Sequence, residues 1–219
     1  MAEHGGFNHT AQTVRLVEEL ENRYEGHPGL NLTWEVREGI IKHETVYDKA
    51  DAAQFDPELQ PTLEAQLVNF ADEIAYTTHD LDDGLRSQTT TPRDLAGLRL
   101  WDSSLEAIGH GGEFTDTTRH HIVRRLVDVM ITDVIEETAK RLEAGNIQGV
   151  ADVRDAPGKI AAFSAALAPH NSELKAFMYK RLYRHYRVVR MSVKAKRILS
   201  DLFHAYVQEP QQLPDRTQA

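Results

Sequence analysis

Residues 70–85 read FADEIAYTTHDLDDGL and place five carboxylates, one histidine and one tyrosine among apolar residues. Hard divalent cations prefer carboxylate oxygen, and an imidazole nitrogen suits a transition metal. A phenol can stack on a sugar ring and donate a hydrogen bond to a phosphate. These residue types therefore suit a site for a metal ion and a nucleotide-like ligand.

The same segment has the periodicity of an amphipathic helix. At ~100° per residue, Asp72, Tyr76 and Asp80 form a row on one side, at i, i+4 and i+8. An acidic face opposite an apolar face is also what a solvated helix shows. However, residues 70–85 contain no Lys or Arg to pair with the acids, so a bound cation or distant donors would relieve their repulsion. Both interpretations stay open on periodicity alone. The predicted core face is made by Leu63, Leu67, Phe70, Ile74, Leu81 and Leu85.

The elements that must position these residues are predicted to be helices throughout, so the fold class is all-α. Segments with helical periodicity are separated by breaks rich in Gly, Pro or Thr, and no alternating run is long enough to predict a strand. Helices are expected at residues 10–24, 34–45, 62–85, 94–108, 117–142, 171–184 and 188–207.

Composition limits the class of protein. The 219 residues suit one domain or slightly more, and 41% hydrophobic residues are enough for a globular core. No apolar run approaches the ~20 residues that span a bilayer. The absence of cysteine and of a signal-peptide pattern leads us to expect a cytoplasmic protein. A net charge of −9 argues against a nucleic-acid or membrane partner.

Four parts of the chain share one resemblance. They read GGFNHTAQTVRLVEELENRY, GLNLTWEVREGIIKHE, FADEIAYTTHDLDDGL, and ELKAFMYKRLYRHYRVVRM followed by KRILSDLFHAY. Together they resemble the deoxyguanosine-triphosphate triphosphohydrolase family, bacterial members of the HD superfamily. The resemblance implies an all-α, usually oligomeric helical bundle that cleaves a dNTP to deoxynucleoside and inorganic triphosphate. It also implies a divalent metal, Mg²⁺, Mn²⁺ or a similar ion, held by a His, a His-Asp pair and a later Asp.

The resemblance assigns separate roles within residues 70–85. Asp72 takes the place of the later metal-binding Asp. Tyr76 matches the tyrosine that packs on the deoxyribose, and Asp80 matches the acid that binds the sugar 3′-hydroxyl. The neighbours His79 and Asp80 suggest a metal-binding His-Asp pair, but by this match they are not that pair, and His79 receives no role.

Two residues outside that helix also become candidates. His9, in FNHTAQ, resembles a histidine near the phosphates in related enzymes. Lys42, in GIIKHE, could reach a phosphate, although a solvated helix lysine is the alternative.

This chain also departs from the family pattern. The family's first metal-binding His, its His-Asp pair and its segment with a catalytic His and Glu have no counterpart here. We therefore expect residues 1–112 to be the remainder of an HD-type catalytic core and residues 113–219 a C-terminal helical region, truncated on the N-terminal side and shorter at the C-terminal end. Because one carboxylate cannot coordinate a catalytic ion alone, this chain by itself is expected to be inactive.

The expected partners are a dNTP substrate, further copies of the chain and a nucleotide effector. The basic run from Lys180 to Arg197 could hold phosphate or an effector, or could be a solvated face that balances an acidic protein. The alternative function is a non-catalytic nucleotide-binding or helical interaction protein.

Overall fold

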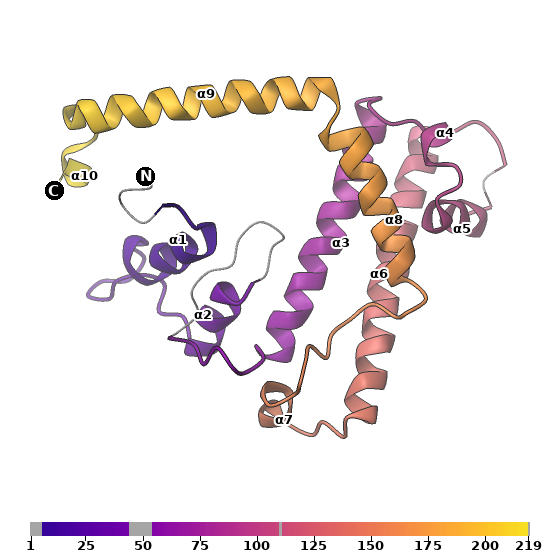
Figure 1. The fold of residues 1–219 in the computed structure, drawn as a ribbon, viewed down its shortest axis with the longest axis horizontal. Coiled ribbons are helices and arrows are strands. Elements are labelled where there is room, and N and C mark those ends of the chain that lie inside the picture. The colour runs from indigo at the N-terminus through magenta and orange to yellow at the C-terminus, as the bar shows by residue number, and fades with distance from the viewer. Residues whose placement is uncertain (1–5, 44–53, 110, 219) are drawn as a thin grey trace. The chain divides into compact units, whose positions relative to one another are not determined.

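The computed structural model describes residues 6–43, 54–109 and 111–218. Helices make up the fold (Figure 1), and the described residues form no strand, only two isolated bridges in the turn after the first helical segment. The prediction of an all-α fold is confirmed. The helices are α1 (His9–Arg15) with a π-helical turn (Leu16–Leu20), α2 (Trp34–Ile41), α3 (Leu63–Arg86), α4 (Pro92–Leu95), α5 (Arg99–Ala107), α6 (Asp116–Ala144), α7 (Val150–Arg154), α8 (Ala168–Met178) with a π-helical turn (Tyr179–Tyr183), α9 (Tyr186–Gln208), a 3-10 turn (Pro210–Gln212) and α10 (Asp215–Gln218).

The chain divides into two compact units, and each is discontinuous in sequence. Unit 1 comprises residues 1–79 and 121–169, and unit 2 comprises residues 80–120 and 170–219. The helices α3 and α6 contribute residues to both. The functional boundary expected after residue 112 stays a prediction, because compactness alone does not say which residues work together.

In unit 1, α1 and α2 pack around a small apolar cluster. Val14, Ile41 and Phe55 are buried, and Trp34 packs against them with its ring centroid 5.6 Å from that of Phe55. The first helix was expected to reach Tyr24 but ends at Leu20, because the chain turns back on itself. In this turn the amide of Leu30 donates to the carbonyl of Val17 at 2.7 Å.

Unit 1 also holds its long helices to a distant loop through buried side chains. The amide oxygen of Gln66, on α3, accepts hydrogen bonds from the backbone of Ile160 and Ala161 at 2.8 and 3.2 Å. On α6, the carboxylate of Asp133 accepts from the amide and hydroxyl of Ser164. These bonds satisfy backbone groups that would otherwise lose water on burial.

In unit 2, the expected helix at residues 94–108 is two helices. Gly97 adopts φ +96, a left-handed conformation that ends α4 before α5 begins. The side chain of Trp101, on α5, is almost fully buried, and its ring lies 6.0 Å from that of Phe114. Arg119 is bound by Asp82 and, at 3.3 Å, by Asp116, so the beginning of α6 is fixed by charge.

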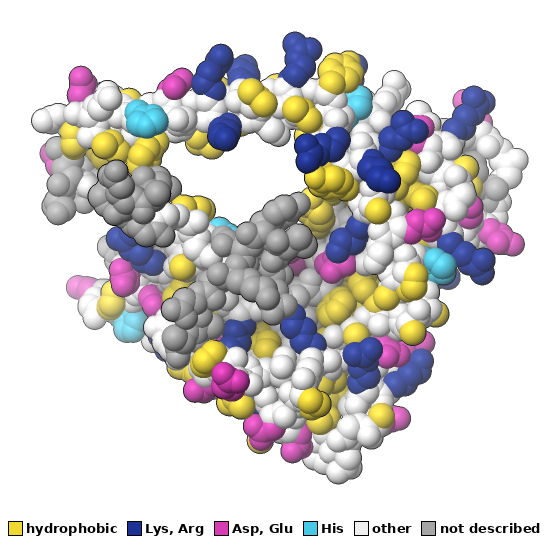
Figure 2. Space-filling model, viewed as in Figure 1, with side chains coloured by type: hydrophobic (Ala, Val, Ile, Leu, Met, Phe, Trp, Pro, Cys, Tyr) yellow, Lys and Arg dark blue, Asp and Glu magenta, His cyan; other side chains and the backbone are white. Residues whose placement is uncertain are grey.

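The C-terminal helices of unit 2 differ from each other in burial. α8 was expected to begin at Asn171 or Ser172 but begins at Ala168, and the side chain of Asn171 is buried within it. α9 contains no buried residue, and its Lys and Arg side chains gather in its N-terminal half (Figure 2). None of the helices among the described residues is long and apolar enough to cross a membrane.

Candidate functional site

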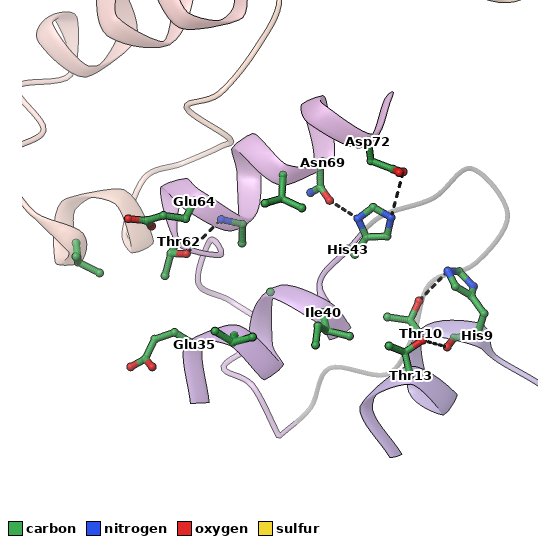
Figure 3. A pocket seen from close by; sticks show the side chains of 15 residues that line it. His9, Thr10, Thr13, Glu35, Ile40, His43, Thr62, Glu64, Asn69 and Asp72 are labelled. Carbon is green, nitrogen blue, oxygen red and sulfur yellow. Dashed lines mark hydrogen bonds and ion pairs between the residues drawn. The ribbon is translucent and has the colours of Figure 1, made fainter. Parts of the chain in front are cut away.

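A cavity of about 780 Å³ lies within unit 1, where α1, α2 and α3 approach one another. Figure 3 shows the side chains in its wall, including His9 from α1, His43 from the end of α2 and Asp72 from α3. The same wall carries apolar side chains such as Val36, Ile40 and Val68. A largely apolar pocket with a few convergent polar groups is the usual form of a small-molecule site.

In this pocket the imidazole of His43 approaches the carboxylate of Asp72. The ring nitrogen Nε2 of His43 lies 3.9 Å from Oδ2 of Asp72, and the other ring nitrogen, Nδ1, is hydrogen-bonded to Oδ1 of Asn69 (Figure 3). The side chain of Asp72 is 69% exposed, whereas that of His43 is only 27% exposed. The carboxylate can therefore receive a ligand from the solvent side of the pocket.

His9 stands in the first turn of α1 and also lines the pocket. Its Nε2 lies 3.3 Å from the hydroxyl of the buried Thr10, and its backbone carbonyl accepts from Thr13 at 2.8 Å. The side chain of Asn8 caps the helix by accepting from the amide of Ala11. His9 thus lies in the wall of the same cavity as Asp72.

The electrostatic character of the pocket favours cations. Glu35, Glu64 and Asp72 lie in its wall, and none of the described residues that line it is Lys or Arg. Hydrogen bonds with its own backbone amide and with Thr33 lower the pKa of Glu35, so this carboxylate stays ionised at neutral pH. A triphosphate entering this pocket would need positive charge from a bound ion or from groups outside the wall.

Lys42 lies beside the pocket in a network of its own. Its ammonium group donates to the carboxylate of Glu38 at 2.7 Å and to the backbone carbonyls of Asp56 and Leu59, each at 2.8 Å. Arg154 binds the same carboxylate, and this hydrogen bond raises the pKa of Arg154. An ammonium group has three donors, and here all three are used within the protein. The phosphate contact of Lys42 stays a prediction, and it would require one of these bonds to break.

Tyr76 and Asp80 follow Asp72 along α3, one and two turns later. The ring of Tyr76 is 52% exposed. Asp80 belongs to unit 2, where its Oδ2 accepts a hydrogen bond of 2.7 Å from the hydroxyl of Tyr183. Asp80 and Tyr183 line a second cavity of about 680 Å³ in that unit, together with Ser87 and Thr89.

The implied divalent metal is only partly matched by the donors that the structure brings together. The described residues contain no group of three or more His, Asp or Glu side chains close enough to hold an ion. Asp72 and His43 nevertheless offer an oxygen and a nitrogen of the right chemistry in one wall. These two donors alone do not make up a metal site among the described residues.

The site contains residues that the sequence did not single out. His43 follows Lys42 in GIIKHE, and Asn69 precedes FADEIAY, but nothing in their spacing shows that they meet. Tyr183 stands in the quoted segment ELKAFMYKRLYRHYRVVRM, although no role was given to it. The signal that could have drawn attention to His43 and Tyr183 is their place inside segments that already carried the resemblance.

Comparison with known proteins gives consistent relatives. Residues 161–219 match the model of a phosphohydrolase-associated domain. A deoxyguanosinetriphosphate triphosphohydrolase-like protein of Geobacter sulfurreducens is 44% identical over 218 residues, which cover 98% of this chain and 57% of the relative. Proteins of the same name from Thiobacillus denitrificans and Ralstonia nicotianae are 41% and 40% identical, covering all of this chain and 60% and 58% of the relatives.

The chain thus spans less than two thirds of the length of the curated relatives that it matches. The identity extends over both units rather than over one motif. Nearly all residues of this chain are thus similar to a part of deoxyguanosinetriphosphate triphosphohydrolase-like proteins.

Proposed function

We propose that this chain forms one side of the active site of a metal-dependent dNTP triphosphohydrolase, with a dGTP-like substrate. The observation that carries the proposal is the position of Asp72. This carboxylate lies in the wall of a large pocket that also contains two histidines. None of the described residues that line the pocket is Lys or Arg. The names of the relatives supply the substrate class.

The proposed roles of the residues follow from their chemistry. Asp72 holds the divalent ion, and His9 lies near the phosphates. When bound, such an ion polarises a phosphoryl oxygen and activates water for attack at the α-phosphate. Tyr76 packs on the deoxyribose, and Asp80 accepts a hydrogen bond from the 3′-hydroxyl. Because Tyr183 already binds Oδ2 of Asp80, the sugar would use Oδ1.

One observation favours binding without hydrolysis as the alternative function. Among the described residues, no three metal-binding side chains come together, and two donors are too few for a catalytic ion. The 219-residue chain alone is therefore expected to bind nucleotide and to release little or no triphosphate. We further propose that the protein is a cytoplasmic homo-oligomer and that its basic run from Lys180 to Arg197 is the place for a nucleotide effector.

The substrate assignment can be tested through the sugar. Calorimetric titration of the chain in Mn²⁺ should show dGTP binding about tenfold more tightly than GTP, because Tyr76 and Asp80 leave little room for a 2′-hydroxyl. Asp80→Ala should abolish this preference. Asp83→Ala, an exposed acid on the same helix, is the matched control and should keep it. Equal affinity for dGTP and GTP in the unmodified chain would contradict the proposal.

A further inference from the structure

The second cavity, in unit 2, contains side chains that the proposed function does not use. Its volume of about 680 Å³ lies in the range of small-molecule sites. Asp80 and Tyr183 form one part of its wall, and Leu182 and Val188 give another part an apolar surface. Polar groups beside apolar side chains suit a flat aromatic ring that carries hydrogen-bonding groups at its edge.

Two charged side chains in this wall, those of Asp83 and Arg86, stand three positions apart on α3. Residues at this spacing on a helix are close enough to pair. Among the described residues, however, neither side chain has a hydrogen-bond or ion-pair partner, the other one included. Arg119 in the same unit, by contrast, binds Asp82 and Asp116. A carboxylate and a guanidinium in one cavity wall are thus both available to a ligand.

This pair suits a ligand that presents acceptors next to donors. A guanidinium group only donates hydrogen bonds, and a carboxylate only accepts them. Guanine offers O6 and N7 as acceptors, and beside them the N–H of N1 and the amino group at N2 as donors. Adenine has an amino donor in place of O6, as cytosine has in place of the O4 of thymine. Thymine has a carbonyl oxygen where guanine has its N2 amino group, and this oxygen would face the carboxylate. Guanine is therefore the DNA base that satisfies both charged groups.

The proposed position of the sugar makes this cavity a suitable place for the base. Asp80, the proposed partner of the 3′-hydroxyl, lines the same cavity as Asp83 and Arg86. Asp83 lies about 4.5 Å further along the axis of α3 than Asp80. The base is bonded directly to the deoxyribose, so a nucleotide with its sugar at Asp80 brings its base close to these two residues.

We propose that Asp83 and Arg86 bind the guanine base of the nucleotide. Arg86 donates to O6 and N7, and Asp83 accepts from N1 and N2. This inference rests on the proposed function for the position of the sugar. It goes beyond that function, since neither the family resemblance nor the names of the relatives give a role to either residue. Because dGTP and GTP carry the same base, replacing Asp83 lowers the affinity for both and leaves the preference for deoxyribose unchanged.

The test is calorimetric titration of the 219-residue chain, in Mn²⁺, with nucleotides that differ only in the base. The unmodified chain should bind dGTP at least about tenfold more tightly than dATP, which has a donor in place of O6. It should bind dITP, which lacks only the N2 amino group, about fivefold or more weakly than dGTP, because a hydrogen bond to a charged group is lost.

Each substitution should remove one of these differences. Asp83→Ala should make the affinities for dGTP and dITP equal, and Arg86→Ala should remove the preference for dGTP over dATP. Arg93→Ala, an exposed arginine of the same unit that does not line the cavity, is the matched control and should keep both differences.

The outcomes distinguish this inference from the proposed function. If the unmodified chain binds dGTP, dITP and dATP equally but prefers dGTP to GTP, the inference is overturned and the proposed sugar site stands. The inference is also overturned if Asp83→Ala and Arg86→Ala both keep the two differences. If the unmodified chain does not bind dGTP, both proposals are overturned.

Discussion

At the scale of single residues, the carboxylate of Glu38 is the most deeply buried charge near the pocket. Its side chain is 1% exposed, and both Lys42 and Arg154 donate to it. The guanidinium of Arg154 also lies over the ring of Trp34, 5.1 Å from its centroid. These contacts join α2 to α7 and to the segment before α3. They therefore stabilise the position of α2, which contributes residues to the wall of the pocket.

Removing that carboxylate charge should strongly destabilise unit 1. Glu38→Gln leaves the largely buried Lys42 without its carboxylate partner and leaves Arg154 paired only with Asp56, at 3.5 Å. Breaking a buried ion pair costs about 3–5 kcal/mol. Urea unfolding should show this loss as a lower midpoint. Asp128→Asn removes an exposed partner of Arg125 and should cost less than about 1 kcal/mol. Equal effects of the two substitutions would show that the Glu38 network contributes no more than a surface pair.

The hydroxyl of Tyr183 fixes the proposed sugar-binding carboxylate. Tyr183→Phe removes the hydrogen bond to Oδ2 of Asp80 and should reduce dGTP affinity by about tenfold, as expected for a hydrogen bond to a charged group. Tyr179→Phe, which alters a tyrosine bound instead to Arg184, is the control in the same calorimetric titration. Unchanged dGTP affinity in Tyr183→Phe would show that this bond does not serve the ligand.

The sequence predicts the side of a helix on which a residue lies better than it predicts the residue's partner. The exposure of Asp72 and Tyr76 and the burial of Ile74 follow from helical periodicity alone. The contact of His43 with Asn69 spans 26 positions and that of Tyr183 with Asp80 spans 103. Such pairs depend on how elements pack, which local periodicity does not contain.

At the scale of elements, the turn after α1 depends on one glycine. Gly29 adopts φ +69, and a Cβ atom there would overlap the carbonyl oxygen of Val17. Its amide donates to Glu21 at 2.9 Å. This close approach lets the chain reverse after the π-helical turn and return to begin α2. The walls of the pocket made by α1 and α2 are therefore linked by a turn that tolerates no side chain at this position.

A substitution at this turn should separate conformational strain from steric overlap. Gly26→Ala, at φ +76 with no atom near the added carbon, should cost about 1–2 kcal/mol from the left-handed conformation alone. Gly29→Ala adds the overlap with Val17 and should cost clearly more in a urea unfolding measurement. Equal costs at the two positions would mean that the turn adjusts freely and does not fix the pocket walls.

Element boundaries differ in how well the sequence predicts them. The helix expected at residues 62–85 is found at 63–86, since a long apolar stripe and flanking breaks define it. Two misplaced helix boundaries, at Leu20 and Ala168, lie where backbone groups find partners in a turn or loop. The second expected helix also ends early, at Ile41. Residues 44 and 45 of the second expected helix lie outside the described residues.

At the scale of the whole molecule, charge is unevenly distributed. Residues 174–200 contain nine Lys and Arg and no Asp or Glu, although the chain carries a net charge of −9. α9 begins within this segment and ends after it. This helix also exposes large apolar side chains (Figure 2). By helical spacing, Met191, Leu199 and Leu202 share one side of α9, whereas Val193 lies between Arg190 and Arg197 on the basic side.

This distribution supports the proposed homo-oligomer. Exposed apolar side chains along one helix favour association, so sedimentation equilibrium should show self-association of the chain. Replacing Leu199 and Leu202 together by Lys should shift the equilibrium towards monomer. Val193→Lys, at a residue as exposed as Leu199 but on the basic side, should leave it unchanged. A monodisperse, cooperatively unfolding monomer in the unmodified chain would contradict the proposal.

The central claim is that the pocket around Asp72 takes a dNTP together with a divalent ion. The most direct measurement is calorimetric titration of dGTP into the 219-residue chain with Mn²⁺ and with EDTA, for the unmodified protein and Asp72→Asn. The account predicts binding in Mn²⁺ that falls by at least about tenfold in EDTA or on loss of the carboxylate charge. Equal dGTP affinity in all of these conditions, or no binding of dGTP to the unmodified chain in Mn²⁺, would contradict it.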